Sequence, residues 1–151
     1  MVEIRDAGPK DIDFILDCQV KMASETEEMD LDSDTLRNGI EELLRKPELG
    51  TYLVAESDGK PVGCTLTLRE WSDWRNGWVI WIHSVYVIPE FRKMGVFAKI
   101  YEGEKNKVLN DPSVKGLRLY VEKENINAQK VYRRLGMSDE RYQLFEWMPE
   151  D

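Results

Sequence analysis

The stretch from Gly50 to Ile88 constrains the fold most, because three β-rich runs follow one another there with only short turns between them. The runs TYLVAES and VGCTLTLRE are joined by DGKP, which is a hairpin signal. The turn WSDWRNG precedes the third run, WVIWIHSVYVI, at residues 78–88. Strands joined by such short turns pair with each other in opposite directions, so we expect an antiparallel meander in the middle of the chain.

Helical periodicity flanks this meander on its N-terminal side. A short strand is predicted at residues 2–7, and Pro9 then opens PKDIDFILDCQVKMA, whose apolar residues follow helical spacing. A second helical stripe follows in DTLRNGIEELLRK, and Pro47 ends it. The acidic segment SETEEMDLDSD, residues 24–34, lies between the two helices and is predicted to be a loop.

Helices and strands alternate on the C-terminal side. The sequence predicts helices at residues 95–109 and 125–136, a strand at residues 116–123 between them, and a last strand in MSDERYQLFEWM, residues 137–148. We therefore expect one domain, residues 1–151, of the α+β (mixed α/β) class. Its central mixed sheet should have about six or seven strands, flanked by about four helices.

Composition narrows the environment and the partners of the chain. Its 151 residues are 42% hydrophobic, which is enough for one packed core, and no stretch reaches the roughly 18–20 apolar residues of a membrane span. The N-terminus lacks the basic-then-apolar pattern of a secretory signal. A net charge of −8 disfavours nucleic acid as a partner. We therefore expect a soluble, cytoplasmic protein that binds neither nucleic acid nor membrane.

The cysteines and the histidine give no sign of a disulfide framework or a metal centre. Cys18 and Cys64 lie far apart in sequence, in a helical and a strand pattern, and are typical of small buried hydrophobic residues. His83 is the only histidine, and no cluster with the spacing of metal ligands accompanies it. No metal site is predicted.

The segment IPEFRKMGVFAKIYEG, residues 88–103, is the best candidate for binding a ligand. A strand that ends before this turn and a helix that starts near Gly95 leave a short loop, whose outward N–H groups and helix dipole favour an anion such as phosphate. Arg92 and Lys93 add positive charge, and the glycine lets the main chain approach the ligand. The turn has neither the Walker nor the dinucleotide-binding glycine pattern. On these residues alone, an ordinary turn with solvated cations is the simpler interpretation.

Two motifs strengthen the functional interpretation. The stretch VYVIPEFRKMGVFAKIY resembles the acyl-CoA binding segment of the GCN5-related N-acetyltransferase (GNAT) family, which is a strand, a proline, Arg or Gln, two residues, Gly, one residue, then Gly or Ala. Arg92 and Gly95 match this pattern, whereas Phe97 stands where the second small residue is usual and is followed by Ala98.

A second stretch, VEKENINAQKVYRRLGM, resembles the other signature of the same family. The matching residues are Asn125, Ala128, Tyr132, Gly136 and Met137. Two separated segments that agree in order and spacing are harder to obtain by chance than either one alone. The resemblance covers residues 78–148, while the earlier elements suit the family's fold less specifically.

The resemblance implies a GNAT-like acyl-CoA N-acyltransferase fold. It also implies transfer of an acetyl group from acetyl-CoA to a primary amine, with a small molecule preferred over a protein N-terminus. In such enzymes the pantetheine arm lies between two parallel strands that splay apart, which here would be residues 79–88 and 116–122. The implied cofactor-binding residues are Val85, Tyr86, Val87, Arg92, Lys93, Met94, Gly95, Val96, Phe97, Ala98 and Asn125.

The chemistry of amine acetylation asks for a base and an acid. An alkyl ammonium has a reference pKa near 10.4, so a base or a water chain must remove its proton before the amine attacks the thioester. His83 has a suitable reference pKa, although a structural role, a water relay and Glu70 remain alternatives. A strand N–H near Tyr86 or Val87 would stabilise the oxyanion of the tetrahedral intermediate. By resemblance, Tyr132 protonates the departing thiolate, and its alternative role is to fill the core.

The acceptor side of the reaction stays open. The tryptophans of residues 71–81 either line an acceptor pocket or pack the edge of the sheet and the interface of a homodimer. The acidic residues Glu25, Glu27 and Glu28 either attract a cationic amine or form a solvated run of charge. Within the enzyme class, a protein or peptide N-terminal acetyltransferase is the alternative. A non-catalytic CoA-binding module would retain Arg92 and Gly95 but have no use for Tyr132.

Overall fold

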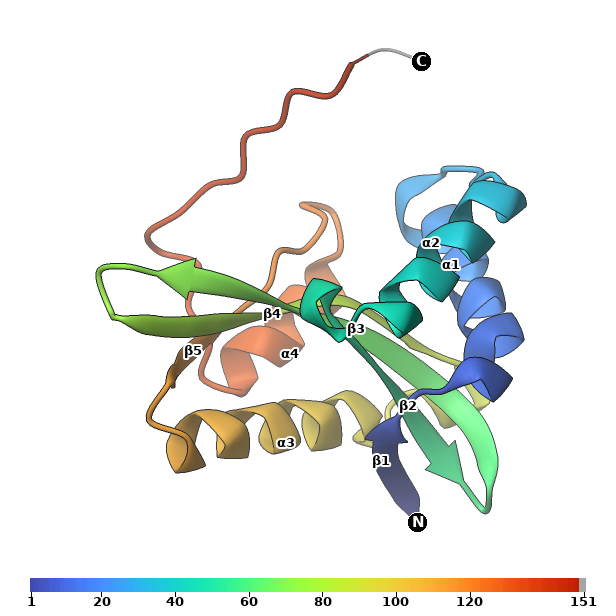
Figure 1. The fold of residues 1–151 in the computed structure, drawn as a ribbon, viewed down its shortest axis with the longest axis horizontal. Coiled ribbons are helices and arrows are strands. Elements are labelled where there is room, and N and C mark those ends of the chain that lie inside the picture. The colour runs from blue at the N-terminus through green and yellow to red at the C-terminus, as the bar shows by residue number, and fades with distance from the viewer. Residues whose placement is uncertain (150–151) are drawn as a thin grey trace. The chain divides into compact units, whose positions relative to one another are not determined.

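The computed structural model describes residues 1–149, which form a mixed α+β fold (Figure 1). Its helices and strands, in chain order, are β1 (Val2–Asp6), α1 (Ile12–Glu27), α2 (Ser33–Arg45), β2 (Thr51–Ser57), β3 (Lys60–Ser72), β4 (Gly77–Val87), α3 (Val96–Asn110), β5 (Val114–Arg118) and α4 (Ile126–Arg134). Short 3-10 turns occupy Pro9–Asp11, Pro47–Leu49 and Pro89–Phe91. The chain divides into two compact units, Met1–Leu119 and the part from Tyr120 onward. A single domain over residues 1–151 stays a prediction.

The first unit is built on one sheet with the strand order β1-β2-β3-β4-β5. The first four strands pair with their sequence neighbours in antiparallel fashion, so the predicted meander is confirmed. Between β2 and β3, Asp58 and Gly59 both have positive φ, at 51° and 77°, as a two-residue hairpin of the twisted sheet requires. Strand β5 runs parallel to β4, which makes the sheet mixed.

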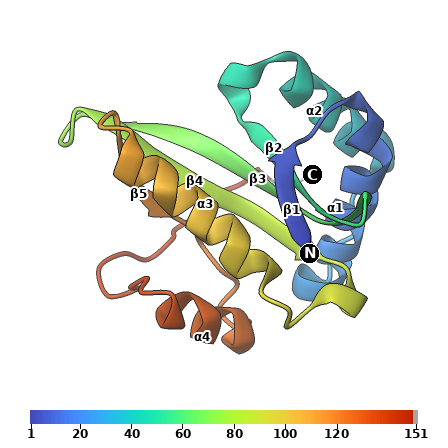
Figure 2. The same cartoon turned by 90° about the horizontal axis from the view of Figure 1, so that it is seen from below.

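Helices cover both faces of this sheet (Figure 2). On one face, α1 and α2 pack on the central strands through a buried cluster that comprises Ile15, Cys18, Ile40, Tyr52, Cys64, Leu66 and Tyr86. On the other face, α3 buries Val96 and Ile100 against Ala55 and Val62. Both cysteines are buried and unbridged, which confirms that they act as small hydrophobic side chains. None of the helices within residues 1–149 is long and apolar enough to span a bilayer.

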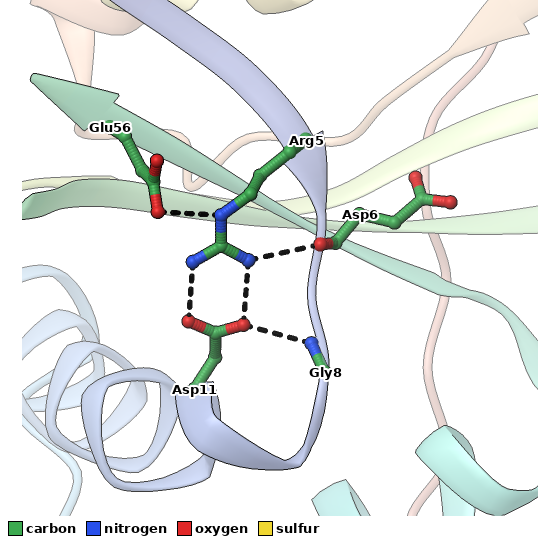
Figure 3. Close-up of polar contacts among 5 residues, drawn as sticks. All are labelled: Arg5, Asp6, Gly8, Asp11 and Glu56. Carbon is green, nitrogen blue, oxygen red and sulfur yellow. Dashed lines mark hydrogen bonds and ion pairs between the residues drawn. The ribbon is translucent and has the colours of Figure 1, made fainter. Parts of the chain in front are cut away.

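A partly buried ion cluster fixes the N-terminal strand (Figure 3). Arg5 on β1 donates two hydrogen bonds of 2.8 Å to the carboxylate of Asp11, and its Nε donates to Glu56 on β2 at 2.6 Å. The same carboxylate accepts from the Gly8 N–H at 2.8 Å. The hydrogen bond from Arg5 holds the pKa of Asp11 below its ordinary value. We call these residues, with the Asp6 carbonyl that Arg5 also contacts, the Arg5 cluster.

Two sequence-based expectations about the elements are wrong. Helix α1 continues to Glu27, so the first residues of the predicted loop are helical, because glutamates such as Glu25 and Glu27 are good helix formers. Residues 137–149 form no strand, and the sheet has five strands instead of six or seven. A strand exists only where a second strand supplies hydrogen bonds, and the structure supplies none to residues 137–149. The strand predicted at residues 116–123 is β5, which ends at Arg118, so residues 119–123 are not strand. The remaining expected elements are present within a few residues of their predicted ends.

Candidate functional site

The parallel pair β4 and β5 separates halfway along β4. Their ladder ends where Trp81 lies opposite Arg118, although β4 continues to Val87. Among residues 1–149, no strand pairs with the β5 side of β4 beyond this point. The sequence predicted two parallel strands here, and their parallel pairing is confirmed.

A β-bulge lies at the point where the ladder ends. On β3, the adjacent residues Leu66 and Thr67 lie opposite Ser84 and Ile82, so His83 has no counterpart in the register. Such a bulge bends the strand and increases its local twist. It therefore turns the second half of β4 away from the direction of its first half. Sequence reasoning missed the bulge, and its only signal is the polar pair His83 and Ser84 within an apolar run.

The main chain at the end of β4 presents hydrogen-bonding groups on its open side. The Ile88 N–H donates to Val62 on β3 at 2.9 Å, and the Tyr86 carbonyl also lies against β3 at Gly63. Because successive residues of a strand direct these groups to opposite sides, those of Val85 and Val87 face away from β3. The open-side N–H near this point thus belongs to Val87, while that of Tyr86 faces β3.

Arg92 connects the turn after β4 to helix α1. Its Nε donates to the Val87 carbonyl at 2.8 Å, and its Nη2 lies 3.0 Å from a carboxylate oxygen of Glu25. The Tyr86 hydroxyl donates to the other oxygen of Glu25 at 3.2 Å, and the guanidinium lies 5.2 Å from the centre of the Tyr86 ring. The side chains of Arg92 and Glu25 are 43% and 44% exposed. The cation is thus paired but accessible to solvent.

The loop of residues 92–95, which we call the Arg92 loop, leads into helix α3 through two left-handed residues. Lys93 has a φ of 63° and Gly95, the N-cap of α3, a φ of 79°. The first intrahelical bond runs from the Lys99 N–H to the Gly95 carbonyl, so the N–H groups of residues 96–98 have no carbonyl of their own helix to pair with. No acidic residue lies in this first turn, and a Cβ added to Gly95 would meet nothing within 4 Å. This helix end suits a bulky anion.

The structure places both side chains that were considered as the base, His83 on β4 and Glu70 on β3. His83 lies at the surface of β4, but the protein around its ring removes part of its water. This desolvation lowers the pKa of His83 below the ordinary 6.5, so the imidazole is neutral at pH 7. Glu70 instead forms an ion pair with Arg118 at 2.8 Å. A neutral imidazole can accept a proton, and the choice among His83, Glu70 and a water relay stays a prediction.

The second sequence motif forms a capped helix in the second unit. The Asn125 side chain accepts a hydrogen bond of 3.2 Å from the Ala128 N–H at the start of α4. At the other end, Gly136 adopts a φ of 96°, and the Met137 N–H donates to the Tyr132 carbonyl. The motif spacing is therefore that of a short helix with a cap at each end. Burial raises the pKa of Tyr132 above its ordinary 10, so its phenol stays protonated at neutral pH.

The tryptophans lie mainly on the hairpin formed by β3 and β4. Trp71 and Trp78 pack edge to face with ring centres 5.1 Å apart, and the Arg69 guanidinium lies 4.1 Å from the centre of the Trp78 ring. Trp71 is half exposed, and Trp74 in the turn is almost fully exposed. These contacts favour packing along the hairpin for Trp71 and Trp78.

Within residues 1–149, no group of three His, Cys, Asp or Glu side chains is arranged to hold a metal ion. The acidic segment contributes one residue to the contacts around Arg92, which is Glu25. Its pairing with Arg92 was not predicted, because the two residues are 67 positions apart and no local pattern connects them.

Comparison with known proteins gives a consistent picture. Residues 13–137 match the model of the Acetyltransferase (GNAT) family. The crystal structure of a possible acetyltransferase from Clostridium difficile 630 shares 40% identity and a TM-score of 0.91, over 100% of this chain and 99% of that one. No protein of curated function matches the chain.

More distant structures share the fold alone. Aminoglycoside acetyltransferase AAC(6′)-Iy, in complex with the bisubstrate analog CoA-S-monomethyl-acetylneamine, has 17% identity and a TM-score of 0.80, over 99% of both chains. The ribosomal-protein-alanine N-acetyltransferase from Brucella melitensis biovar Abortus 2308 has 16% identity and a TM-score of 0.78, over 98% of this chain and 100% of that one.

Proposed function

Because the chain belongs to the GNAT acetyltransferase family, we propose that it transfers an acetyl group from acetyl-CoA to a primary amine of a small molecule in the cytoplasm. The GNAT-like fold predicted from the sequence is confirmed, with five strands. The observation that carries the proposal is the junction of β4 and α3. There, an open strand edge leads into an exposed loop and then into the N-terminus of a helix.

Each part of acetyl-CoA has a matching part of this junction. In this proposal the diphosphate binds the main-chain N–H groups between Arg92 and Ala98, with the exposed residues Lys93 and Met94 beside it. The pantetheine arm pairs with the open side of β4 at Val85, as an added strand would, and the Val87 carbonyl beyond it accepts from Arg92. Proteins of the same fold have been crystallised with CoA or a CoA-containing analog, which supports this choice of donor.

The reaction needs one base, one oxyanion donor and one acid. The neutral imidazole of His83 takes a proton from the ammonium, and the amine nitrogen then attacks the thioester carbon. The Val87 N–H stabilises the negative oxygen of the tetrahedral intermediate. When the carbon–sulfur bond breaks, the Tyr132 phenol gives its proton to the thiolate, and bulk water restores it. In this scheme Asn125 acts by capping the helix that carries Tyr132.

The position of Glu25 supports the proposal that the acceptor is a cationic amine. Its carboxylate lies beside Tyr86 at the end of β4, and it belongs to a run of acidic residues. A small ammonium compound fits this charge better than a protein N-terminus, which carries one charge on a bulky chain. Glu27 and Glu28 are exposed in the same segment and add to the negative potential.

The test is an amine panel with acetyl-CoA that follows release of the thiol. We expect turnover with small polyamines or amino sugars, and Tyr132→Phe should lower kcat at least about 100-fold while leaving acetyl-CoA affinity unchanged. Tyr52→Phe is the matched control, because burial on β2 raises the pKa of Tyr52 to about 12 and it has no assigned role. Turnover confined to peptides would favour the N-terminal acetyltransferase alternative, and CoA binding without any turnover would indicate a binding module.

A pH profile tests the base. Since the pKa of His83 lies below 6.5, kcat/KM for the amine should contain a limb that rises through a pKa below 6.5, in addition to the limb of the amine itself. His83→Gln should remove the lower limb and reduce kcat about 100-fold. A profile that is unchanged in this variant would assign the proton transfer to water.

A further inference from the structure

Thr65 is a buried polar residue in the middle of β3 that takes no part in the proposed reaction. Its side chain is fully buried, and its hydroxyl donates a hydrogen bond of 2.5 Å to the main-chain carbonyl of Ser84 on β4. Valine has nearly the same shape and brings no polar group that needs a partner, so packing alone does not require a threonine here. What distinguishes Thr65 from a packing residue is thus the bond that its hydroxyl makes.

A second hydrogen bond reaches Ser84 from the opposite face of the sheet. The Gln19 side chain on α1 donates to the Ser84 hydroxyl at 3.1 Å. Cys64 and Leu66 belong to the buried cluster beneath α1 and α2, so Thr65 between them points to the other face. Ser84 is therefore held by Gln19 on one face of the sheet and by Thr65 on the other.

The position of Ser84 makes these two bonds important, because it directly follows the bulge in β4. His83 has no counterpart in the register with β3, and a bulge disrupts the ladder locally. Pairing resumes at Ser84, which lies opposite Leu66. The Thr65 hydroxyl thus adds a bond at the residue where β4 recovers its pairing.

The carbonyl of Ser84 and the N–H of Val85 belong to one peptide group. This peptide bond is trans and planar, so its carbonyl and its N–H point in opposite directions. The carbonyl faces β3 and Thr65, and the N–H therefore faces the open side of β4. A bond that fixes the carbonyl on the β3 side also fixes the N–H on the open side. The same bond polarises the peptide group, so the N–H becomes a stronger donor.

We propose that Thr65 is a positioning residue for the acyl donor and acts through the peptide group that joins Ser84 to Val85. This inference rests on the proposed function, in which the pantetheine arm pairs with β4 at Val85. The Thr65 hydroxyl holds the Val85 N–H in the direction in which it donates to a carbonyl of the arm. Thr65 itself does not touch the donor, so its substitution should weaken binding without removing any direct contact.

The first test compares two threonines of β3. Thr65→Val should weaken CoA binding, measured by calorimetry, about fivefold, because the bond that orients the Val85 N–H is lost. Thr65→Ser keeps a hydroxyl and should bind CoA as the wild type does. Thr67→Val is the matched control, because Thr67 is also buried but its hydroxyl donates to the Thr51 carbonyl on β2, at 3.4 Å. Equal CoA affinity in wild type and Thr65→Val, or an equal loss in Thr67→Val, would overturn the proposal.

A truncated ligand separates positioning of the arm from a general loss of structure. The nucleotide part of CoA, 3′-phospho-ADP, contains the diphosphate but no pantetheine, so its affinity should be the same in wild type and Thr65→Val. An equal loss of affinity for CoA and for 3′-phospho-ADP would show that Thr65 only supports the fold, and would overturn the proposal. A wild type that binds neither ligand would refute the proposed function, and this inference with it.

A measurement on the wild type depends on no variant. In protein labelled with ¹⁵N, saturating CoA should shift the amide proton resonance of Val85, because its N–H gains a new acceptor. The amide of Tyr86 faces β3 and should shift less. A Val85 resonance that stays in place would overturn the proposal.

Discussion

Two arginines in this protein bind carboxylates, and their surroundings differ. Arg5 makes hydrogen bonds to two carboxylates and a carbonyl, and the side chain of Asp11 against it is only 4% exposed (Figure 3). Arg92 makes one bond to a carboxylate and one to a carbonyl, and it remains open to solvent on an exposed loop. The Arg5 cluster joins β1 and β2 to the turn before α1, whereas Arg92 joins the end of β4 to α1.

The difference separates stability from function. Arg5 is half-buried, and its hydrogen bonds join it to the buried carboxylate of Asp11, so it cannot exchange partners without leaving that charge unpaired. The Arg5 cluster therefore holds the fold together. A half-exposed arginine can change partners at little cost in free energy, because water screens its charge. We therefore expect substitutions around Arg5 to change the free energy of unfolding, and substitutions around Arg92 to change the binding of ligands.

The largest effect is expected at Asp11. Asp11→Ala leaves Arg5 with one carboxylate, that of Glu56, and should lower the free energy of unfolding by about 3 kcal/mol. This is the low end for a buried pair, because Arg5 is 27% exposed. Denaturant unfolding at pH 7 measures this change. Asp13→Ala is the control, since Asp13 is 87% exposed in its pair with Arg37 and its loss should be barely measurable.

The loss of stability in Asp11→Ala should depend on pH. The pKa of Asp11 is lowered in the folded protein, so its contribution is complete above the ordinary value of 3.8 and disappears as pH falls through the lower folded value. The gap in stability between wild type and Asp11→Ala should therefore close below pH 3.8. A gap that does not narrow as the pH falls below 3.8 would show that Asp11 acts through packing instead of charge.

A slightly smaller effect is expected at Gly95, and it should appear in binding. Gly95→Glu places a carboxylate at the helix end that we assign to the diphosphate, so acetyl-CoA affinity measured by calorimetry should fall about 100-fold, or roughly 2.7 kcal/mol. Gly95→Ala separates backbone strain from charge, because both variants strain the left-handed residue but only one adds charge. If Gly95→Glu binds acetyl-CoA as tightly as Gly95→Ala does, the added charge has no effect, and the site of the diphosphate lies elsewhere.

The smallest effect is expected at Glu25. Glu25→Gln removes the anion that faces Arg92, so acetyl-CoA should bind up to about fivefold more tightly, while the KM for the amine rises. Glu27→Gln changes the net charge equally in the same exposed segment and serves as the control. Equal shifts in both variants would trace the effect to overall charge and remove the distinction between the two arginines.

Local patterns in the sequence predicted most of the fold. The strand Thr51–Ser57 has the limits that its residues predicted, because the turns at both of its ends carry strong signals. The helix after Gly95 was likewise predicted from its spacing and its glycine. The conformation of residues 137–148 was predicted wrongly. Their composition favours a strand, but a strand also requires a neighbouring strand, which composition does not supply.

The same distinction applies to the site. The Arg92 loop and the α4 motif were found from residue types and spacing, since a helix end and its caps are local features. The contact between Glu25 and Arg92 depends on how α1 packs against β4, and the bulge at His83 depends on how β4 pairs with β3. Both are tertiary features, and no short stretch of sequence encodes either of them.

The early end of the β4–β5 ladder has an evolutionary consequence. Every amino acid except proline brings the same amide and carbonyl, so a binding edge made of peptide groups survives almost any substitution along it. Selection can then alter the side chains around such an edge to admit new acceptors without losing the donor. Chains with only 16–17% identity to this one still share its architecture.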